Sequence, residues 1–210
     1  MGRLIPQTCQ LSAGAPVNCY YPHQTPLGPT PMKLFFAAAT DSDAPELAAL
    51  HRAAVEDLTL RFGPGFWSSP PTERGILANM RKPKFSRTLV VRKGVRIVGA
   101  LRLATKKPWA IDTGYFTSAS HPLYLTGMVV HPSHQRQGIG RLLLKEAEAT
   151  AASPASRSWE LANPAHAIRL DAFDAVAGAG PFYAKCGYRE IARVVYKNNP
   201  LVYFEFALPR

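Results

Sequence analysis

The sequence predicts an α/β (α+β) domain whose mixed, mostly antiparallel sheet of about seven strands carries helices on both faces. Apolar, β-prone segments alternate along the chain with segments of helical periodicity. Some strands are joined by short turns, as in hairpins, and others are separated by a helix. The 210 residues are enough for one domain with a sizeable buried core.

The N-terminal part of the chain differs from the rest. Residues 1–31 are rich in proline, and Arg3 is the one Asp, Glu, Lys or Arg among them. Their apolar residues follow neither helical nor strand periodicity. This composition predicts an irregular, Pro-rich extension. The folded domain is therefore expected over residues 32–210.

The first half of the domain begins with a strand and two helices. The expected elements are a strand over 33–40, helices over 41–63 and 71–80, and strands over 86–94 and 95–106. The long helix has an apolar stripe that includes Leu47, Leu50 and Leu58, with Asp41 or Ser42 as its cap. The last two strands flank a hairpin turn at Lys93–Gly94.

The second half places a long polar loop before an apolar strand. The expected elements are a strand over 122–130, a helix from Arg141, a strand over 167–175, a short helix over 179–188, and strands over 189–198 and 200–208. Gly187 is suited to end the short helix in a left-handed conformation. A turn around Asn198–Pro200 joins the last two strands.

A glycine-bearing turn separates the strand over 122–130 from the helix that follows. Its sequence is Gln135-Arg136-Gln137-Gly138-Ile139-Gly140, and it has neither the Walker A nor the Rossmann glycine pattern. A turn that opens a helix directs backbone N–H groups and a partial positive charge at an anion. With donors on Gln135, Arg136 and Arg141, a pyrophosphate fits best. The alternative is a turn whose glycines only allow close packing.

Two segments resemble motifs of the GNAT N-acetyltransferase superfamily. The stretch V-x-P-x-x-Q-x-x-G-x-G, from Val130 to Gly140, resembles its acyl-CoA-binding motif. The stretch IRLDAFDAVAGAGPFYAKCGY, from Ile168 to Tyr188, resembles the strand and helix that end in F-Y-x-K-x-G-F in that family. The expected order of elements resembles the GNAT fold from about Met32 to Leu208.

The resemblance implies a V-shaped splay between the strands YLTGMVV and IRLDAF, with acetyl-CoA as co-substrate beside it. Backbone groups of the first strand would bind the pantetheine arm, and the turn would bind the pyrophosphate. The implied binding residues are Met128, Val129, Val130, Gln135, Arg136, Gln137, Gly138, Ile139, Gly140 and Arg141. An amine would attack the thioester directly, and a backbone N–H near Met128 would stabilise the oxyanion.

Tyr183 matches the family tyrosine that protonates the departing CoA thiolate, a role that a phenol of high pKa suits. The alternative is a packing role beside Phe182. Val176 departs from the family, which often has an asparagine there that helps to hold the CoA arm. Cys186 is expected to be a small buried hydrophobic residue.

The general base is not evident from the sequence. Thr126 and Gly127 stand where some relatives carry a glutamate. The possible substitutes are Glu56, Asp57, Glu73, Asp112, Asp171 and His121, and a water relay is an equal alternative. Two aromatic groups are candidates for the walls of an acceptor pocket, with ordinary packing as the alternative: Phe62, Phe66 and Trp67, then Trp109, Tyr115 and Phe116.

Composition limits the partners. The formal net charge is +11, but the basic residues are scattered and no helix-turn-helix signal accompanies them, so a nucleic-acid partner is not expected. His131 and His134 have no apparent third ligand, and Cys9, Cys19 and Cys186 lack metal-site spacing, so no metal is expected. No apolar run reaches the ~20 residues of a membrane span, which predicts a cytoplasmic protein without a membrane partner.

The expected function is therefore an acetyl-CoA-dependent N-acetyltransferase that acts on a primary amine of a small molecule or peptide. The alternative is a non-catalytic acyl-CoA-binding module of the same fold, since no base is evident. A homodimer is left open.

Overall fold

A computed structural model of the protein describes residues 33–82, 85–153 and 164–209. The strands are β1 (Leu34–Ala38), β2 (Ser86–Lys93), β3 (Arg96–Ala104), β4 (Pro122–Val130), β5 (Ala167–Phe173), β6 (Arg189–Tyr196) and β7 (Asn199–Ala207). The helices are α1 (Ala44–Phe62), α2 (Glu73–Met80), α3 (Ile139–Ala152) and α4 (Gly180–Lys185). The predicted extension over 1–31 lies outside the described residues.

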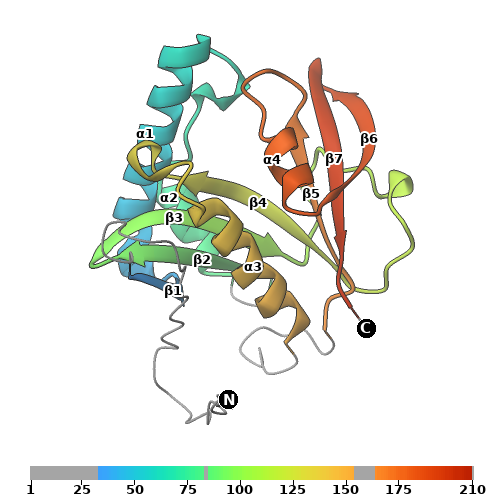
Figure 1. The fold of residues 1–210 in the computed structure, drawn as a ribbon, viewed down its shortest axis with the longest axis horizontal. Helices are drawn as coiled ribbons and strands as arrows, with labels where there is room; N and C mark the ends of the chain where they lie inside the picture. Colours follow the sequence, from blue (N-terminus) through green and yellow to red (C-terminus); the bar gives the residue numbers. More distant parts are fainter. Residues whose placement is uncertain (1–32, 83–84, 154–163, 210) are drawn as a thin grey trace, which may run out of the picture.

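The strands form one seven-stranded sheet in the order β1-β2-β3-β4-β5-β7-β6. Neighbouring strands are antiparallel except β4 and β5, which run parallel. Helices α1 and α2 cover one face of the sheet, and α3 and α4 lie on the other (Figure 1). The structure confirms the predicted mixed, mostly antiparallel sheet with helices on both faces.

Each face of the sheet has its own apolar core. Leu47 and Leu50 of α1 pack with Ile76 of α2 against the β2–β4 region. On the other face, Leu143 and Leu144 of α3 are fully buried among side chains from the central strands. Burial of such residues supplies most of the stabilisation of a domain of this size. The helices are thereby held on opposite sides of the same central strands.

The parallel pair β4–β5 comes apart after a short contact. The two strands pair only at Pro122–Ala167, Leu123–Ile168 and Tyr124–Arg169. Both continue beyond this point, and β5 stays paired with β7 along its full length. The backbone groups on this edge of β4 beyond Tyr124 therefore have no strand partner. This is the predicted splay between the two central strands.

Strand β4 also bulges beside the splay. Its pairing with β3 shifts between Ala100, opposite Val129, and Arg102, opposite Thr126. Gly127 and Met128 thus stand opposite the single residue Leu101. Gly127 has φ +59°, a left-handed conformation that glycine adopts at little cost. Because a bulge bends the backbone locally, it changes the direction of the backbone groups of β4 beside the splay.

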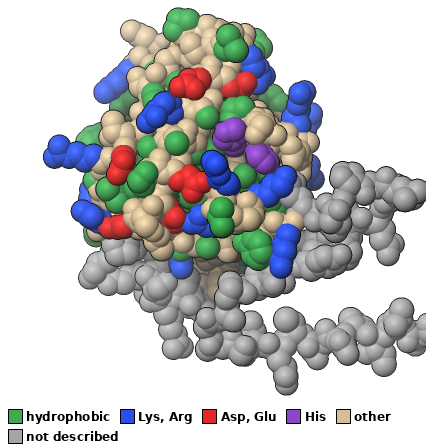
Figure 2. Space-filling model, turned by 90° about the vertical axis from the view of Figure 1, so that its left-hand side faces the viewer, with side chains coloured by type: hydrophobic (Ala, Val, Ile, Leu, Met, Phe, Trp, Pro, Cys, Tyr) green, Lys and Arg blue, Asp and Glu red, His purple; other side chains and the backbone are tan. Residues whose placement is uncertain are grey.

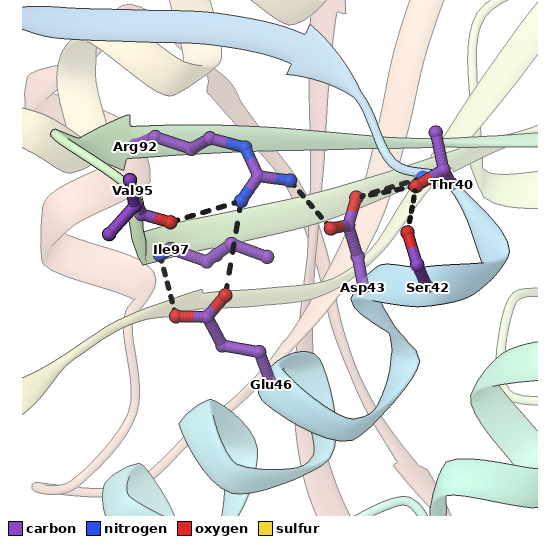
Figure 3. Close-up of polar contacts among 7 residues, drawn as sticks. All are labelled: Thr40, Ser42, Asp43, Glu46, Arg92, Val95 and Ile97. Atoms are coloured by element: carbon purple, nitrogen blue, oxygen red, sulfur yellow. Dashed lines mark hydrogen bonds and ion pairs between the residues drawn. The ribbon is translucent and has the colours of Figure 1, made fainter.

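The start of α1 is anchored to the β2–β3 hairpin (Figure 3). The Asp43 carboxylate accepts hydrogen bonds from Arg92, 2.6 Å away, and from the backbone N–H of Thr40, 2.9 Å away. Glu46 accepts a hydrogen bond from the backbone N–H of Ile97 at 3.0 Å. Burial alone would raise the pKa of Asp43, but Thr40 and Arg92 hold it below its ordinary value. These contacts fix α1 over the sheet.

Three predicted boundaries are wrong in detail. A 3-10 turn over Asp41–Asp43 precedes α1, which begins at Ala44, so neither Asp41 nor Ser42 caps it. Helix α3 begins at Ile139 rather than Arg141. The β6–β7 turn is made by Lys197 and Asn198, both with positive φ, as a tight hairpin with two central residues requires.

Candidate active site

The turn between β4 and α3 forms a backbone cradle, defined here as residues 136–141. Arg136 and Gly138 have left-handed backbone conformations, with φ values of +59° and +81°. Within the described ranges, no group accepts a hydrogen bond from the backbone N–H of any cradle residue. These amides therefore remain available at the positive end of α3, which is the arrangement predicted to bind a pyrophosphate.

The glutamine side chains hold the cradle in shape. Nε2 of Gln135 donates to the carbonyl of Val130 at 3.1 Å, and Nε2 of Gln137 donates to the carbonyl of Ser133 at 3.0 Å. Gln135 is thus engaged with its own chain rather than free as a ligand donor. The side chains of Arg136 and Arg141 are exposed beside the cradle, where they can add positive charge.

The two glycines of the motif have different roles. A Cβ on Gly138 would meet nothing within 4 Å, so a ligand can approach the backbone there. A Cβ on Gly140 would lie 3.1 Å from Cζ of Phe182, so this glycine lets α4 pack closely on α3. Ile139 is buried in the core beneath them. The expected close approach of a ligand therefore belongs to Gly138, and Gly140 serves packing.

The last residues of β4 present backbone groups to the splay. The N–H of His131 donates to the carbonyl of Val98 on β3 at 2.9 Å. Since successive N–H groups of a strand point to opposite sides, the N–H of Val130 faces away from β3. The splay thus exposes an unpaired edge to which an extended ligand could add like a further strand. Met128 and Val129 precede Val130 on this segment.

Tyr183 lies on α4, on the α3–α4 face of the sheet, and contacts β4 beside the splay. Its hydroxyl donates a weak hydrogen bond to Sδ of Met128, 3.6 Å away. The ring is buried among Phe182, Tyr188 and Phe204, with ring centroids 5.3 to 5.9 Å apart. Burial raises the pKa of Tyr183 well above its ordinary value, so the phenol stays protonated at neutral pH. The packing and acid roles are thus compatible.

Asp171 is the predicted base that interacts electrostatically with this phenol. It lies on β5 beyond the last β4–β5 pair, and its charge contributes to the raised pKa of Tyr183. Burial raises the pKa of Asp171 itself. A carboxyl whose charged form is disfavoured by burial accepts a proton more readily than an exposed one.

The other predicted bases do not lie at the splay. Asp57 is paired with Arg61 at 3.0 Å, and Asp112 accepts a hydrogen bond from the backbone N–H of Gly114 at 2.9 Å. Glu56, Glu73 and His121 are exposed. These five are surface or turn residues, as most acidic and histidine side chains are.

A pocket opens on the opposite face of the sheet, between α1, α2 and the middle of β3 and β4. Its volume is ≈ 190 Å³. It is lined by Leu47, His51, Pro71, Ile76, Asn79, Thr88, Ala100, Leu101, Arg102, Thr126 and Gly127. Gly127 belongs to the bulge of β4, so the pocket ends at the strand that borders the splay, on the face opposite to α4, and its lining residues include none from β5.

His51 is a candidate base that the sequence analysis missed. Its Cε1 is 3.8 Å from the position of a Cβ on Gly127. Burial lowers the pKa of His51, so the imidazole is neutral at pH 7. The signal was present in the sequence, because His51 stands four residues after Leu47, on the apolar stripe of the helix.

The predicted aromatic walls do not line this pocket. Phe66 and Trp67 approach Phe173 at the end of β5, with ring centroids 4.8 and 6.3 Å apart. Phe116 is buried and stacks on Tyr203. None of the six candidate aromatic residues lines the pocket; besides these three, they are Phe62, Trp109 and Tyr115.

Three further expectations concern single residues. Val176 is 92% exposed in the loop between β5 and α4. Cys186 is half-buried against the core rather than fully buried, because it lies at the exposed end of α4.

His131 and His134 both hydrogen-bond the hydroxyl of Ser133. Among the described residues, no three His, Cys, Asp or Glu side chains gather as a metal site would require.

The charged side chains on the α1 face are mixed in sign. Figure 2 shows Lys and Arg side chains interspersed with Asp and Glu side chains over this face. No continuous basic stripe crosses the part of the surface in view. In the described ranges, no helix has both the length and the apolar character needed to cross a bilayer.

Comparison with known proteins identifies the family. A model of the acetyltransferase (GNAT) domain matches residues 84–190, which include β4, the cradle, α3 and Tyr183. No curated protein matches the sequence.

Solved structures of acetyltransferases share the fold. Ribosomal-protein-alanine N-acetyltransferase from Brucella melitensis has a TM-score of 0.60 and 20% identity, and the match covers 83% of this chain and 99% of that one. An acetyltransferase from Thermus thermophilus has a TM-score of 0.57 and 19% identity, and the match covers 83% of this chain and 97% of that one. The structure of yncA from Salmonella typhimurium holds its cofactor acetyl-CoA. It has a TM-score of 0.55 and 17% identity, and the match covers 84% of this chain and 95% of that one.

Proposed function

Because the chain belongs to the GNAT acetyltransferase family, we propose that it is an acetyl-CoA-dependent N-acetyltransferase acting on a primary amine. One observation carries the proposal: β4 leaves β5 after Tyr124, and the freed part of β4 borders the pocket on the α1 face and leads into the cradle at its end. Two reactants can therefore meet at this part of β4. Holding them in line removes much of the entropic barrier to a bimolecular transfer.

The residues of the cradle fit the phosphates of acetyl-CoA. The unpaired amides of residues 136–141 would bind the pyrophosphate, assisted by the charges of Arg136 and Arg141. The unpaired edge formed by Met128, Val129 and Val130 would bind the pantetheine arm. Acetyl-CoA, as co-substrate, supplies the acetyl group as a thioester at the splay.

The side chains around the splay have complementary roles in this proposal. A backbone N–H near Met128, re-aimed by the bulge at Gly127, would stabilise the oxyanion. Tyr183 would donate a hydrogen bond to the departing thiolate. His51, neutral and beside Gly127, would accept the proton of the attacking amine, and Asp171 is the second candidate for that step.

The acceptor is proposed to be a small-molecule or peptide amine rather than a nucleic acid. The Brucella relative acts, by its name, on the alanine of a ribosomal protein, which indicates that this fold can serve a peptide amine. The mixed charges of the α1 face, in the view of Figure 2, do not favour a phosphate backbone.

A screen of primary amines with acetyl-CoA tests the proposal, and release of the CoA thiol is the readout. Turnover that depends on both the amine and Tyr183 is the expected result. Binding of acetyl-CoA without turnover of any small amine or peptide would contradict the proposal. It would favour the non-catalytic acyl-CoA-binding module, since β4 carries Thr126 and Gly127 rather than a carboxylate.

A further inference from the structure

The pocket on the α1 face has a mainly apolar lining, with polar side chains around one arginine. Among the residues that line it, His51, Asn79, Thr88, Arg102 and Thr126 carry polar side chains, and none is an aspartate or glutamate. Its volume of ≈ 190 Å³ is below the 300–1,000 Å³ of pockets that enclose drug-sized ligands. It therefore suits a small molecule or the end of a larger one.

Arg102 enters this pocket from β3 with most of its hydrogen-bonding capacity unused. Its Nε donates to Oγ1 of Thr126 on the neighbouring strand, 3.0 Å away. That bond fixes the plane of the guanidinium. Within the described ranges, no carboxylate pairs with Arg102, and no group accepts a hydrogen bond from its two terminal nitrogens. Burial without an anion lowers its pKa.

Two other sheltered arginines are paired. Arg92 contacts Asp43 at 2.6 Å, and Arg169 contacts Glu205 at 2.8 Å. A guanidinium withdrawn from water is costly unless an anion compensates it. Among the described residues, Arg102 is half-buried and lacks such a partner. A ligand that brings a negative charge would supply it.

We propose that Arg102 binds a carboxylate of the acceptor, so that the substrates are primary amines that also carry a carboxylate group. The terminal nitrogens of a guanidinium form two parallel hydrogen bonds with a carboxylate. Thr126 is next to Gly127, where β4 bulges and His51 approaches. An acceptor held by its carboxylate at Arg102 thus extends its amine toward the splay. The part of this inference that concerns transfer to the amine rests on the proposed function.

A binding experiment tests the carboxylate site without turnover. The probes are N-acetylglycine and N-acetylglycinamide, which differ only in the charge of one end, and ligand-observed NMR in the presence of CoA is the readout. We expect the acid to bind and to lose at least about tenfold in affinity in Arg102→Gln, as for hydrogen bonds to a charged group. Arg102→Lys, which keeps the charge, is expected to bind with intermediate affinity.

Arg96→Gln is the matched control, because Arg96 is an exposed residue of the same strand outside the pocket. It should leave the affinity for the acid unchanged. Equal binding of the acid and the amide by the wild type, or equal binding of the acid by Arg102→Gln and the wild type, would overturn the inference. Melting temperatures of all variants show whether each one is folded.

Turnover then separates this inference from the proposed function. The acceptors are ω-amino acids from glycine to 6-aminohexanoate, each beside its amide, with phosphoethanolamine as a phosphate-bearing amine. We expect the acids to exceed the amides in kcat/KM, and Arg102→Gln to remove the difference. Binding of N-acetylglycine without turnover of any amine would support the site while contradicting the transferase. Preference for phosphoethanolamine over every acid would overturn the carboxylate assignment.

Discussion

The imidazole of His51 lies against Gly127, with Cε1 3.8 Å from the position that a Cβ on this glycine would occupy. The contact joins the middle of α1 to the bulge of β4. The 3.8 Å is an ordinary van der Waals distance, and the Asp43–Arg92 pair helps to hold α1 over the sheet at this point. A neutral base is thereby held at the point where two reactants would meet.

Replacement of His51 should remove a base. His51→Gln is expected to lower kcat about 10²–10⁴-fold, the usual contribution of a positioned proton acceptor. Because burial lowers the pKa of His51, kcat of the wild type should fall only below pH 6.5, and this fall should be absent in the variant. The pH profile of kcat at saturating amine measures both effects. His121→Gln, at an exposed histidine, is the control. If Asp171→Asn removes the acidic limb and His51→Gln does not, Asp171 is the base.

Replacement of Tyr183 should affect transfer and not binding. Tyr183→Phe is expected to lower kcat about 10²-fold, near the lower end for a proton donor, because burial makes the phenol a weaker acid. Since the hydroxyl makes only a long contact to the sulfur of Met128, acetyl-CoA affinity and melting temperature should barely change. Steady-state kinetics and calorimetric titration of acetyl-CoA measure these quantities. A variant with the kcat of the wild type would leave Tyr183 with packing alone.

A charge in the cradle should exclude acetyl-CoA. Gly138→Glu is expected to weaken binding at least about 100-fold, through repulsion of the pyrophosphate and steric block. The domain should still fold, because a Cβ at this position meets nothing within 4 Å. Gly138→Asn is the control, since asparagine tolerates a positive φ without adding charge. Titration of acetyl-CoA into both variants gives the comparison, and equal losses in the two would point to backbone strain instead of repulsion.

The anchor of α1 should be visible in the pH dependence of stability. Asp43→Asn is expected to lower the free energy of unfolding by about 2–3 kcal/mol at pH 7, since it weakens hydrogen bonds to a charged group. The pKa of Asp43 is lowered in the folded state, so its contribution is complete above about pH 4, the ordinary value of an unfolded aspartate. It is lost as the pH falls through the lower folded value.

Urea unfolding of wild type and variant between pH 7 and pH 2 measures this difference. The difference in the free energy of unfolding between the two proteins should disappear on acidification. Asp41→Asn provides the control, because Asp41 pairs with Arg81 at the surface, where an ion pair contributes little. A difference in the free energy of unfolding that persists at pH 2 would show that Asp43 stabilises the helix without its charge.

Local patterns were sufficient to predict the order of elements. Helical periodicity and β-prone runs are properties of neighbouring residues, so the strand-turn-helix unit around Gly138 could be recognised before any tertiary contact was known. The ends of elements were less certain. The start of α1 depends on Thr40 and on Arg92, which lies 49 residues beyond Asp43 in the sequence. Such a contact leaves no local signal.

The sequence by itself determined the family, the order of the elements and the strand-turn-helix unit that holds the cradle, because each depends on residues close together in the chain. The tertiary structure decided the pocket, where His51, Arg102 and Thr126 come from three elements and meet over the bulge of β4. It also decided that Gly140 packs against Phe182 while Gly138 stays open. The physical reason is that burial arises only when distant segments pack together. Burial sets the charge state of His51, and it shelters Arg102 where no described residue supplies a compensating anion.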